Sequence, residues 1–139
     1  MKAFIASVAS LTILFVCAST QNKSVFTGLL YNEETKMAIH INLDTPTVKV
    51  PGLPFLGGTN GYMSNGILYG TWIITDFKTN KGIANIRLTN DFGADTQTLT
   101  ITRIKADTFS VELQPPVVMR RVVKGKLVKI NPKYTFVKK

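Results

Sequence analysis

The amino-acid sequence predicts an all-β protein, a single-domain antiparallel barrel or sandwich of about nine short strands. Three observations lead to this fold class. Apolar and polar residues alternate along most of the chain, and residues that favour strands, such as Thr, Val, Ile, Phe and Tyr, are frequent. Turn-forming residues separate the alternating runs at short intervals, which is typical of sandwiches and barrels.

The alternation is clearest in two runs. Met37, Ile39 and Ile41 alternate with small or polar residues, and Phe109 and Val111 alternate with Thr and Ser. Such a pattern places one set of side chains on a buried face and the other in water. The expected strands cover residues 25–31, 36–43, 47–50, 60–64, 67–77, 82–89, 97–104, 108–114 and 117–123, with short pieces at 126–130 and 134–138. No stretch repeats apolar residues every three and four positions, so we expect little helix in the mature chain.

The segment 51–66 departs from simple strands. It is rich in Gly and Pro, and its Asn-Gly pairs at 60–61 and 65–66 favour tight hairpin turns because both residues tolerate positive φ. Phe55 and Leu56 lie in the early, proline-containing part of this segment. Two interpretations are open for these side chains: they form a lid over a binding mouth, or they plug one end of a barrel.

Residues 1–19 have the layout of a secretory signal peptide. Lys2 precedes an apolar run that ends near Ala18, and small residues follow, which suits cleavage after Ser19 or Thr20. The run is shorter than the ~20 residues of a bilayer anchor, and no second run of that length occurs, so we expect no membrane span. The expected mature domain is 20–139, secreted to the outside or, in a bacterium, to the periplasm. Asn22 begins an Asn-Lys-Ser acceptor for N-glycosylation if the source is a eukaryote.

The chain has little of the chemistry that metal and nucleophilic sites need. Cys17, the only cysteine, lies in the signal peptide, so the mature chain has no disulfide, thiolate ligand or cysteine nucleophile. His40, the only histidine, falls on the polar side of its strand, where we expect it to be exposed. The oxygen-rich stretch 90–95 has the composition of an ordinary turn and lacks the spacing of a helix–loop–helix calcium site. We expect no catalytic residue, no metal and no cofactor.

Positive charge is concentrated at one end of the chain. Residues 21–114 carry eight basic and eight acidic residues, whereas residues 115–139 carry eight basic residues and no acid. This asymmetry indicates an anionic partner, such as a glycan, a phosphate-rich polymer or an acidic surface. The expected binding residues are Arg120, Arg121, Lys124, Lys126, Lys129 and Lys133. The alternative is that the basic terminus only keeps the protein soluble. Nucleic acid is not expected as the partner, because the chain is expected to be exported and lacks a nucleic-acid-binding motif.

The basic terminus also contains enough apolar residues to fold. We expect a hairpin over residues 117–139 that turns at 124–126 and lies on the sheet. Val117, Val118, Val122 and Val123 should anchor it, because leaving each valine in water forgoes roughly 1.5 kcal/mol of burial. The sequence therefore predicts a rigid basic patch.

Two other functions stay open beside a non-catalytic binding module. A barrel could carry a small apolar ligand in its interior, with the 51–66 loop as a gate. A glycosidase or lyase could be built on Asp76 or Glu112. Tyr69 and Trp72 either stack on a ligand or sugar ring, or Trp72 belongs to the core. The stretch Gly70-Thr71-Trp72 resembles the Gly-x-Trp motif of lipocalins. In that family the motif lies near the start of the barrel, whereas here it lies in mid-chain, so the resemblance extends only to a barrel of the same general kind and assigns no family.

Overall fold

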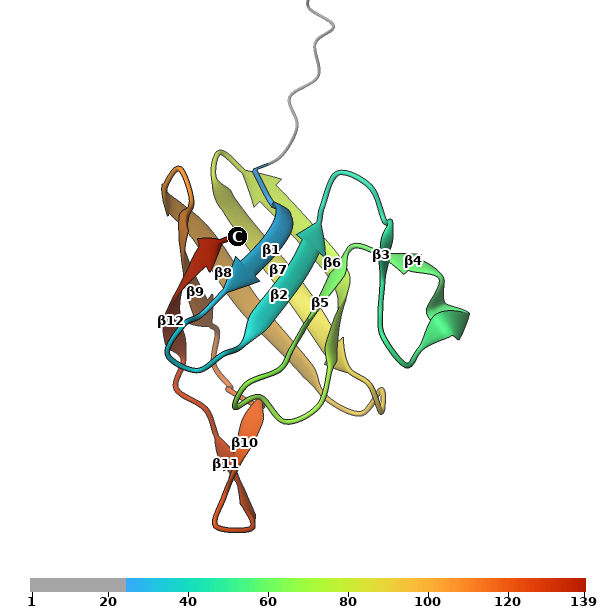
Figure 1. Cartoon of the computed structure of the whole chain (residues 1–139), viewed down its shortest axis with the longest axis vertical. Coiled ribbons are helices and arrows are strands. Elements are labelled where there is room, and N and C mark those ends of the chain that lie inside the picture. The colour runs from blue at the N-terminus through green and yellow to red at the C-terminus, as the bar shows by residue number, and fades with distance from the viewer. Residues whose placement is uncertain (1–24) are drawn as a thin grey trace, which may run out of the picture.

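The computed structural model describes residues 25–139 and shows a closed antiparallel barrel (Figure 1). The all-β prediction is confirmed, and closure decides between the barrel and the sandwich. The signal peptide and Asn22 lie outside the described residues. Within residues 25–139, no helix is long and apolar enough to cross a bilayer.

Eight strands form the barrel in the order β1-β12-β9-β8-β7-β6-β5-β2. Their bounds are β1 (Thr27–Tyr31), β2 (Ala38–Asn42), β5 (Gly61–Ser64), β6 (Trp72–Asn80), β7 (Ile83–Asn90), β8 (Thr96–Lys105), β9 (Thr108–Leu113) and β12 (Lys133–Lys138). Each barrel strand pairs with the next one along the chain, and β12 closes the ring against β1 through Leu30↔Lys138 and Tyr31↔Val137. Closure leaves no open sheet edge in the barrel.

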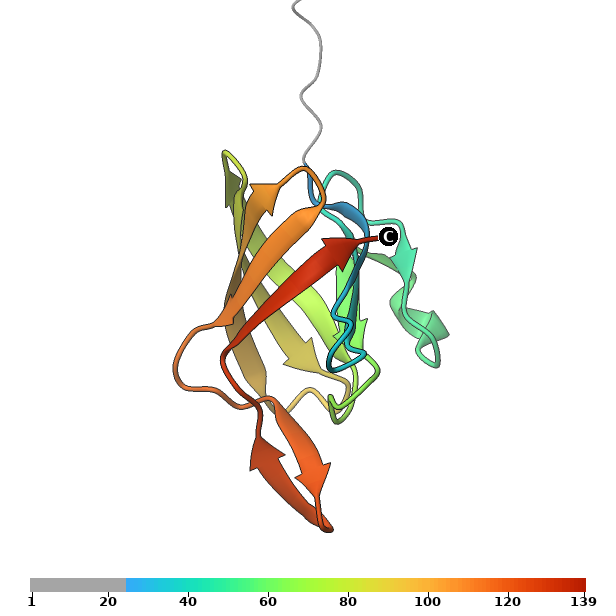
Figure 2. The same cartoon turned by 60° about the vertical axis from the view of Figure 1, so that its left-hand side comes forward.

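Two excursions interrupt this simple order. Between β2 and β5 the chain forms the short pair β3 (Val48–Lys49) and β4 (Gly58–Thr59), which flank a 3-10 turn, η2 (Pro54–Leu56). Between β9 and β12 it forms the hairpin β10 (Arg120–Val123) and β11 (Lys126–Lys129). The first excursion lies beside the barrel wall, and the second projects beyond one end of the barrel (Figures 1 and 2).

Inward-facing side chains fill the barrel. Strand β8 alternates exposed and buried residues along its first half, as period-two patterning requires. Phe26, Phe109 and Phe136 are among the largest fully buried side chains, and the rings of Phe26 and Phe109 lie 5.9 Å apart. A barrel of eight strands is just wide enough for side chains to occupy its interior. The hydrophobic core is therefore the lumen of the barrel.

The strand expected over 67–77 begins later, at Trp72, and extends to Asn80. Asn65 and Gly66 both have positive φ, as an Asn-Gly turn requires, but the chain then stays irregular up to Thr71. Its amides find partners outside the β5–β6 ladder: Ile67 donates to Thr35 O at 3.1 Å. These bonds hold residues 67–71 as a connection at the end of the barrel.

Phe55 and Leu56 do not plug the barrel. Phe55 is 79% exposed and Leu56 is 40% exposed, on the excursion that lies outside the wall. The residue of this excursion that is buried is Val50, and the outward-facing Tyr62 and Ser64 of β5 are buried as well. The lumen is instead occupied by other buried side chains of the described chain, such as Phe26, Phe109 and Phe136.

The C-terminal prediction is partly wrong. A hairpin forms, but it ends at Lys129, and residues 133–138 are a barrel strand. Val117 and Val118 pack against the core as expected, whereas Val122 and Val123 are 53% and 39% exposed. The hairpin extends past the end of the barrel, and no second layer covers it (Figure 2).

Candidate functional site

The hairpin β10–β11 carries most of the residues expected to bind an anion. Its register is Arg120↔Lys129, Arg121↔Val128, Val122↔Leu127 and Val123↔Lys126. Because directly opposed residues of a strand pair share a face, the side chains divide into two sets. One face presents Arg120, Val122, Leu127 and Lys129, and the other presents Arg121, Val123, Lys126 and Val128. Each face therefore combines two cations with two aliphatic side chains.

The tip of the hairpin is a two-residue turn. Lys124 and Gly125 have φ values of 51° and 77°, and this pair of positive φ values matches the twist of the flanking strands. Glycine adopts this conformation without strain, and the preceding lysine accepts it at the outermost point of the hairpin. Lys124 is consequently presented at the tip, with Lys126 directly after the turn.

The base of the hairpin is held firmly by the barrel. Gln97 on β8 is buried, and its Oε1 accepts hydrogen bonds from the backbone N–H groups of Val118 and Met119 at 2.7 and 3.4 Å. Tyr69 donates its backbone N–H to Arg120 O at 2.9 Å. Met119 is fully buried in the barrel core. The cations thus sit on a hairpin whose root has one defined position.

The positive charge of the hairpin is not balanced by acidic residues of the hairpin itself. Residues 120–129 contain five Lys or Arg and no acid. Among residues 25–139, the ion pairs within 4.0 Å join Glu33 to Lys36 and to Lys139, and none involves the hairpin. Arg120 and Lys129 stand directly opposite one another, an unfavourable arrangement for like charges across a strand pair.

Arg121 lies near the start of β12, the strand that begins at Lys133. Within the described chain, Nε of Arg121 is buried and has no hydrogen-bond partner. Burial raises the pKa of the Tyr134 phenol, and the nearby charge of Arg121 opposes that rise. Lys133 begins β12 and borders a cleft together with Glu33 and Glu34. Lys133 therefore belongs to the root of the hairpin and has acidic neighbours there.

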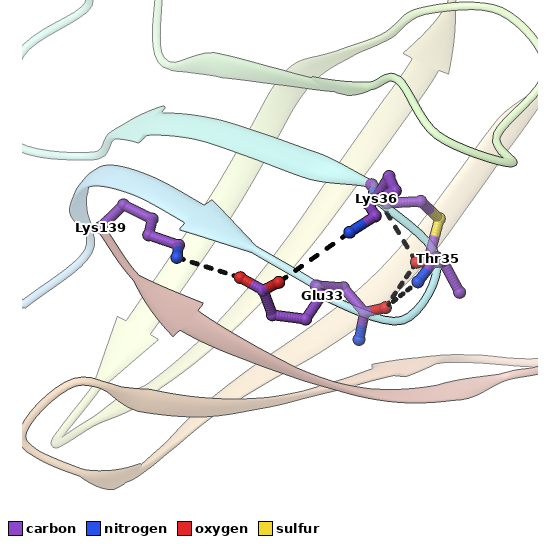
Figure 3. A network of polar contacts seen from close by, with 6 residues as sticks. Glu33, Thr35, Lys36 and Lys139 are labelled. Atoms are coloured by element: carbon purple, nitrogen blue, oxygen red, sulfur yellow. Dashed lines mark hydrogen bonds and ion pairs between the residues drawn. The ribbon is translucent and has the colours of Figure 1, made fainter.

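The last two lysines of the chain are not part of this site. Lys138 Nζ donates to Val25 O at 3.2 Å. Lys139 Nζ lies 3.0 Å from Oε2 of Glu33, as Figure 3 shows, and 5.4 Å from the ring centre of Tyr31. Lys139 lowers the pKa of Glu33, first by this hydrogen bond and then by its charge. The basic terminus is thus divided between the projecting hairpin and the wall of the barrel.

A small cleft lies between the hairpin and the barrel end. It has a volume of about 120 Å³, and Tyr69, Phe92, Arg120 and Leu127 are among its lining residues. Trp72 also borders it but is only 3% exposed, and its Nε1 donates to Tyr69 O at 3.4 Å. Trp72 is a core residue, so the exposed aromatic rings here are Tyr69 and Phe92, which are 48% and 76% exposed.

The sequence reasoning missed Phe92 and Leu127 as part of this site. Phe92 stands alone in the polar turn between β7 and β8, and a large apolar residue in such a turn was the available signal. Leu127 falls in the expected short strand 126–130, part of a hairpin that the sequence places on the sheet. Leu127 lies near Arg120 because both are on one face of the hairpin, whereas the nearness of Phe92 to Arg120 depends on contacts between distant parts of the chain.

The two carboxylates considered for an enzyme do not converge. Asp76 on β6 lies opposite Arg87, and Glu112 on β9 lies opposite Lys133, both exposed on the outside of the barrel. Strands β7 and β8 separate them, so they are three strand spacings apart, about 14 Å along the sheet. Paired glycosidase carboxylates stand roughly 5–9.5 Å apart. Among residues 25–139 there is also no group of three or more His, Cys, Asp or Glu side chains that could hold a metal ion.

His40 differs from the expected exposed histidine. It faces outward from β2 but is half-buried, and its ring stacks on that of Tyr62 with a centroid distance of 4.7 Å and an interplanar angle of 15°. Burial lowers the pKa of His40 and raises the pKa of Tyr62. The pair lies on the barrel wall and has no acidic or nucleophilic side chain bonded to it among the described residues.

The chain matches no protein-family model, and neither the curated proteins nor the solved structures contain a significant match. Its function is therefore inferred from the chemistry of the site itself.

Proposed function

We propose that this protein is a secreted, non-catalytic binding module that holds an anionic partner through the hairpin β10–β11. The observation that carries the proposal is the set of five cations on a projecting ten-residue hairpin that has no acid and no ion pair within the described chain. Arg120, Arg121, Lys124, Lys126 and Lys129 supply the charge, and Lys133 adds to it at the root.

Electrostatics supports this assignment. Four of the five cations lie on two strands of four residues each, and Lys124 lies in the turn that joins them, so neighbouring charges fall within one Debye length, about 8 Å at physiological ionic strength. The opposed pair Arg120 and Lys129 repels in the free protein. A polyanion bound to the face that presents Arg120 and Lys129 would relieve this repulsion.

The competing explanation is that the lysines only keep the hairpin from associating with other chains. Lysine on an exposed strand edge opposes pairing with another strand, and no third strand of the described chain pairs with this hairpin beyond the bond from Tyr69 to Arg120 O at its root. That explanation requires charge but no particular partner, so a binding measurement separates the two. The apolar carrier is the less favoured alternative, because large side chains occupy the barrel interior in the described part of the chain.

The test is retention on immobilised heparin at low salt. We expect the native protein to be retained and to elute with rising salt, because charge contacts weaken as ions screen them. The variant Lys124→Gln/Lys126→Gln/Lys129→Gln should elute much earlier. Its thermal unfolding midpoint should equal that of the native protein.

A matched control removes the same charge elsewhere. Lys78→Gln/Lys81→Gln/Lys105→Gln changes three lysines near the β6–β7 and β8–β9 turns, at the opposite end of the barrel. It should elute close to the native protein. Equal shifts for the two triple variants, or a native protein that is not retained, would overturn the proposal.

A further inference from the structure

The hairpin exposes hydrocarbon as well as charge. Val122, Val123, Leu127 and Val128 are 53%, 39%, 50% and 44% exposed, and together they make up four of its ten residues. They occur on both faces, since Val122 opposes Leu127 on one face while Val123 and Val128 lie on the other. A purely ionic polymer, such as a sulfated glycan, offers little surface on which these side chains could be buried.

The end of the barrel next to the hairpin continues this surface. Tyr69 and Phe92 belong to the β5–β6 and β7–β8 connections, which reach the same barrel end as the hairpin because neighbouring strands are antiparallel. Both rings are exposed and border the cleft that Leu127 also lines. Asp91 and Asp95 border that cleft from the barrel side, whereas the projecting hairpin carries no acid. The part that reaches furthest from the barrel is therefore entirely cationic and aliphatic.

We propose that the anionic partner is an anionic phospholipid surface, on which the tip of β10–β11 docks. This inference rests on the proposed function and names its partner. Lys124, Lys126 and Lys129 would lie at the level of the lipid phosphates, while the neighbouring Val and Leu side chains would enter the boundary between head groups and acyl chains. Long lysine side chains can keep their ammonium groups at the phosphates while their stems lie along apolar surface.

The shape of the molecule suits this mode of binding. The hairpin projects from the barrel in both views, so it can meet a flat surface before the barrel does (Figures 1 and 2). Its root is held by Gln97 and Tyr69, which limits how far the hairpin can fold back. Tyr69 and Phe92 would then be the next side chains to approach the interface, where aromatic rings are favoured.

The first experiment is co-sedimentation of the full domain with vesicles. Vesicles of equal parts phosphatidylcholine and phosphatidylglycerol should bind the native protein, and vesicles of phosphatidylcholine alone should bind it at least about tenfold more weakly. Leu127→Ser/Val128→Ser should weaken binding to the anionic vesicles by about tenfold, because half-exposed aliphatic side chains lose their burial. The same variant should elute from heparin as the native protein does.

The matched control is Ile83→Ser/Ile104→Ser. These isoleucines are 39% and 55% exposed, but they lie at the opposite end of the barrel. This control should bind vesicles like the native protein. If native protein is retained on heparin but ignores the anionic vesicles, the lipid inference fails while the proposed function stands. If it binds neither, both fail.

A second measurement reports on insertion directly. Leu127→Trp places an indole on the hairpin, while the only native tryptophan, Trp72, is 3% exposed and serves as a constant background. Anionic vesicles should shift the emission of this variant to shorter wavelength, and brominated acyl chains should quench it. Ile104→Trp should show neither effect. Binding without any shift or quenching would mean that the hairpin stays in water, and would overturn the docking of its apolar residues.

Discussion

Oε1 of Gln97 accepts a hydrogen bond of 2.7 Å from the backbone N–H of Val118, and this contact joins the barrel to the root of the projecting hairpin. The same side chain donates from Nε2 to the carbonyl oxygens of Thr98 and Gln114 at 2.9 and 3.0 Å. Gln97 is 1% exposed, so both ends of its amide are paired as burial requires. The hairpin can therefore project without being loosely attached.

The first prediction concerns this amide. Gln97→Leu leaves the N–H of Val118 and the carbonyl of Gln114 without their side-chain partner, and should lower the free energy of unfolding by about 2–4 kcal/mol. Urea denaturation measures the loss. The control is Gln114→Leu, which removes a half-buried side chain bonded to Thr100 and should cost about 1 kcal/mol or less. Equal losses of unfolding free energy would show that the buried Gln97 side chain contributes no more to stability than the half-buried Gln114 side chain.

The second prediction compares two glycines that both have positive φ. A Cβ on Gly61, at φ 143°, would collide with the carbonyl oxygen of His40 and come within 2.9 Å of Cα of Ile41. Gly61→Ala should therefore destabilise the barrel by about 3 kcal/mol or more, since only backbone can move. Gly93, at φ 73°, has no atom within 4 Å of such a Cβ, so Gly93→Ala should cost only about 1 kcal/mol of backbone strain. Thermal unfolding of both variants checks the difference, and a Gly61→Ala variant as stable as Gly93→Ala would contradict the close approach.

The third prediction is a pH dependence of stability that arises from His40. Burial lowers its pKa in the folded state below the ordinary value of 6.5, so the unfolded chain binds the proton more readily. The free energy of unfolding should thus be highest above pH 6.5 and fall as the pH drops through 6.5 toward the lower folded-state pKa. His40→Gln should remove this decline. The pKa of Glu33 is lowered from 4.5 by Lys139, so Glu33 titrates at more acidic pH and does not overlap the pH range in which His40 acts. A variant that keeps the native pH profile would exclude His40 as its source.

The fourth prediction separates a buried contact from an exposed one in the β1–β2 connection. Asn32 is 5% exposed; its Nδ2 donates to Thr135 O at 2.7 Å, and its Oδ1 accepts from the backbone N–H of Thr35 at 2.7 Å. Asn32→Ala should lower the free energy of unfolding by about 2 kcal/mol. Lys139→Ala removes the ion pair seen in Figure 3, which is open to solvent, and should leave stability unchanged within error. Denaturation curves of the two variants test the contrast, and the opposite order would mean that the ion pair anchors the terminus.

The local pattern of the sequence was sufficient to locate most of the strands. Period-two alternation identifies a strand from its own residues, so the runs around Ile39, Leu99 and Phe109 were predicted close to their observed limits. The turn expected at 124–126 is also a local feature, because Gly125 interrupts two apolar runs. The concentration of positive charge in residues 115–139 is likewise a property of composition alone.

The tertiary structure decided which surfaces meet, because alternation states that a face is buried without stating what covers it. The pairing of β1 with β12, which joins residues about a hundred positions apart, turned a barrel-or-sandwich prediction into a closed barrel. The same closure moved residues 133–138 into the wall and left 120–129 projecting, so Val122 and Val123 have no layer to pack against. Contacts between distant segments also placed Phe92 beside Arg120, and buried Trp72 while leaving Tyr69 exposed. The sequence by itself determined most of the strands and the distribution of charge. Only the tertiary structure decided that the cations lie on an exposed, partly apolar hairpin, because burial depends on the packing of residues far apart in the chain.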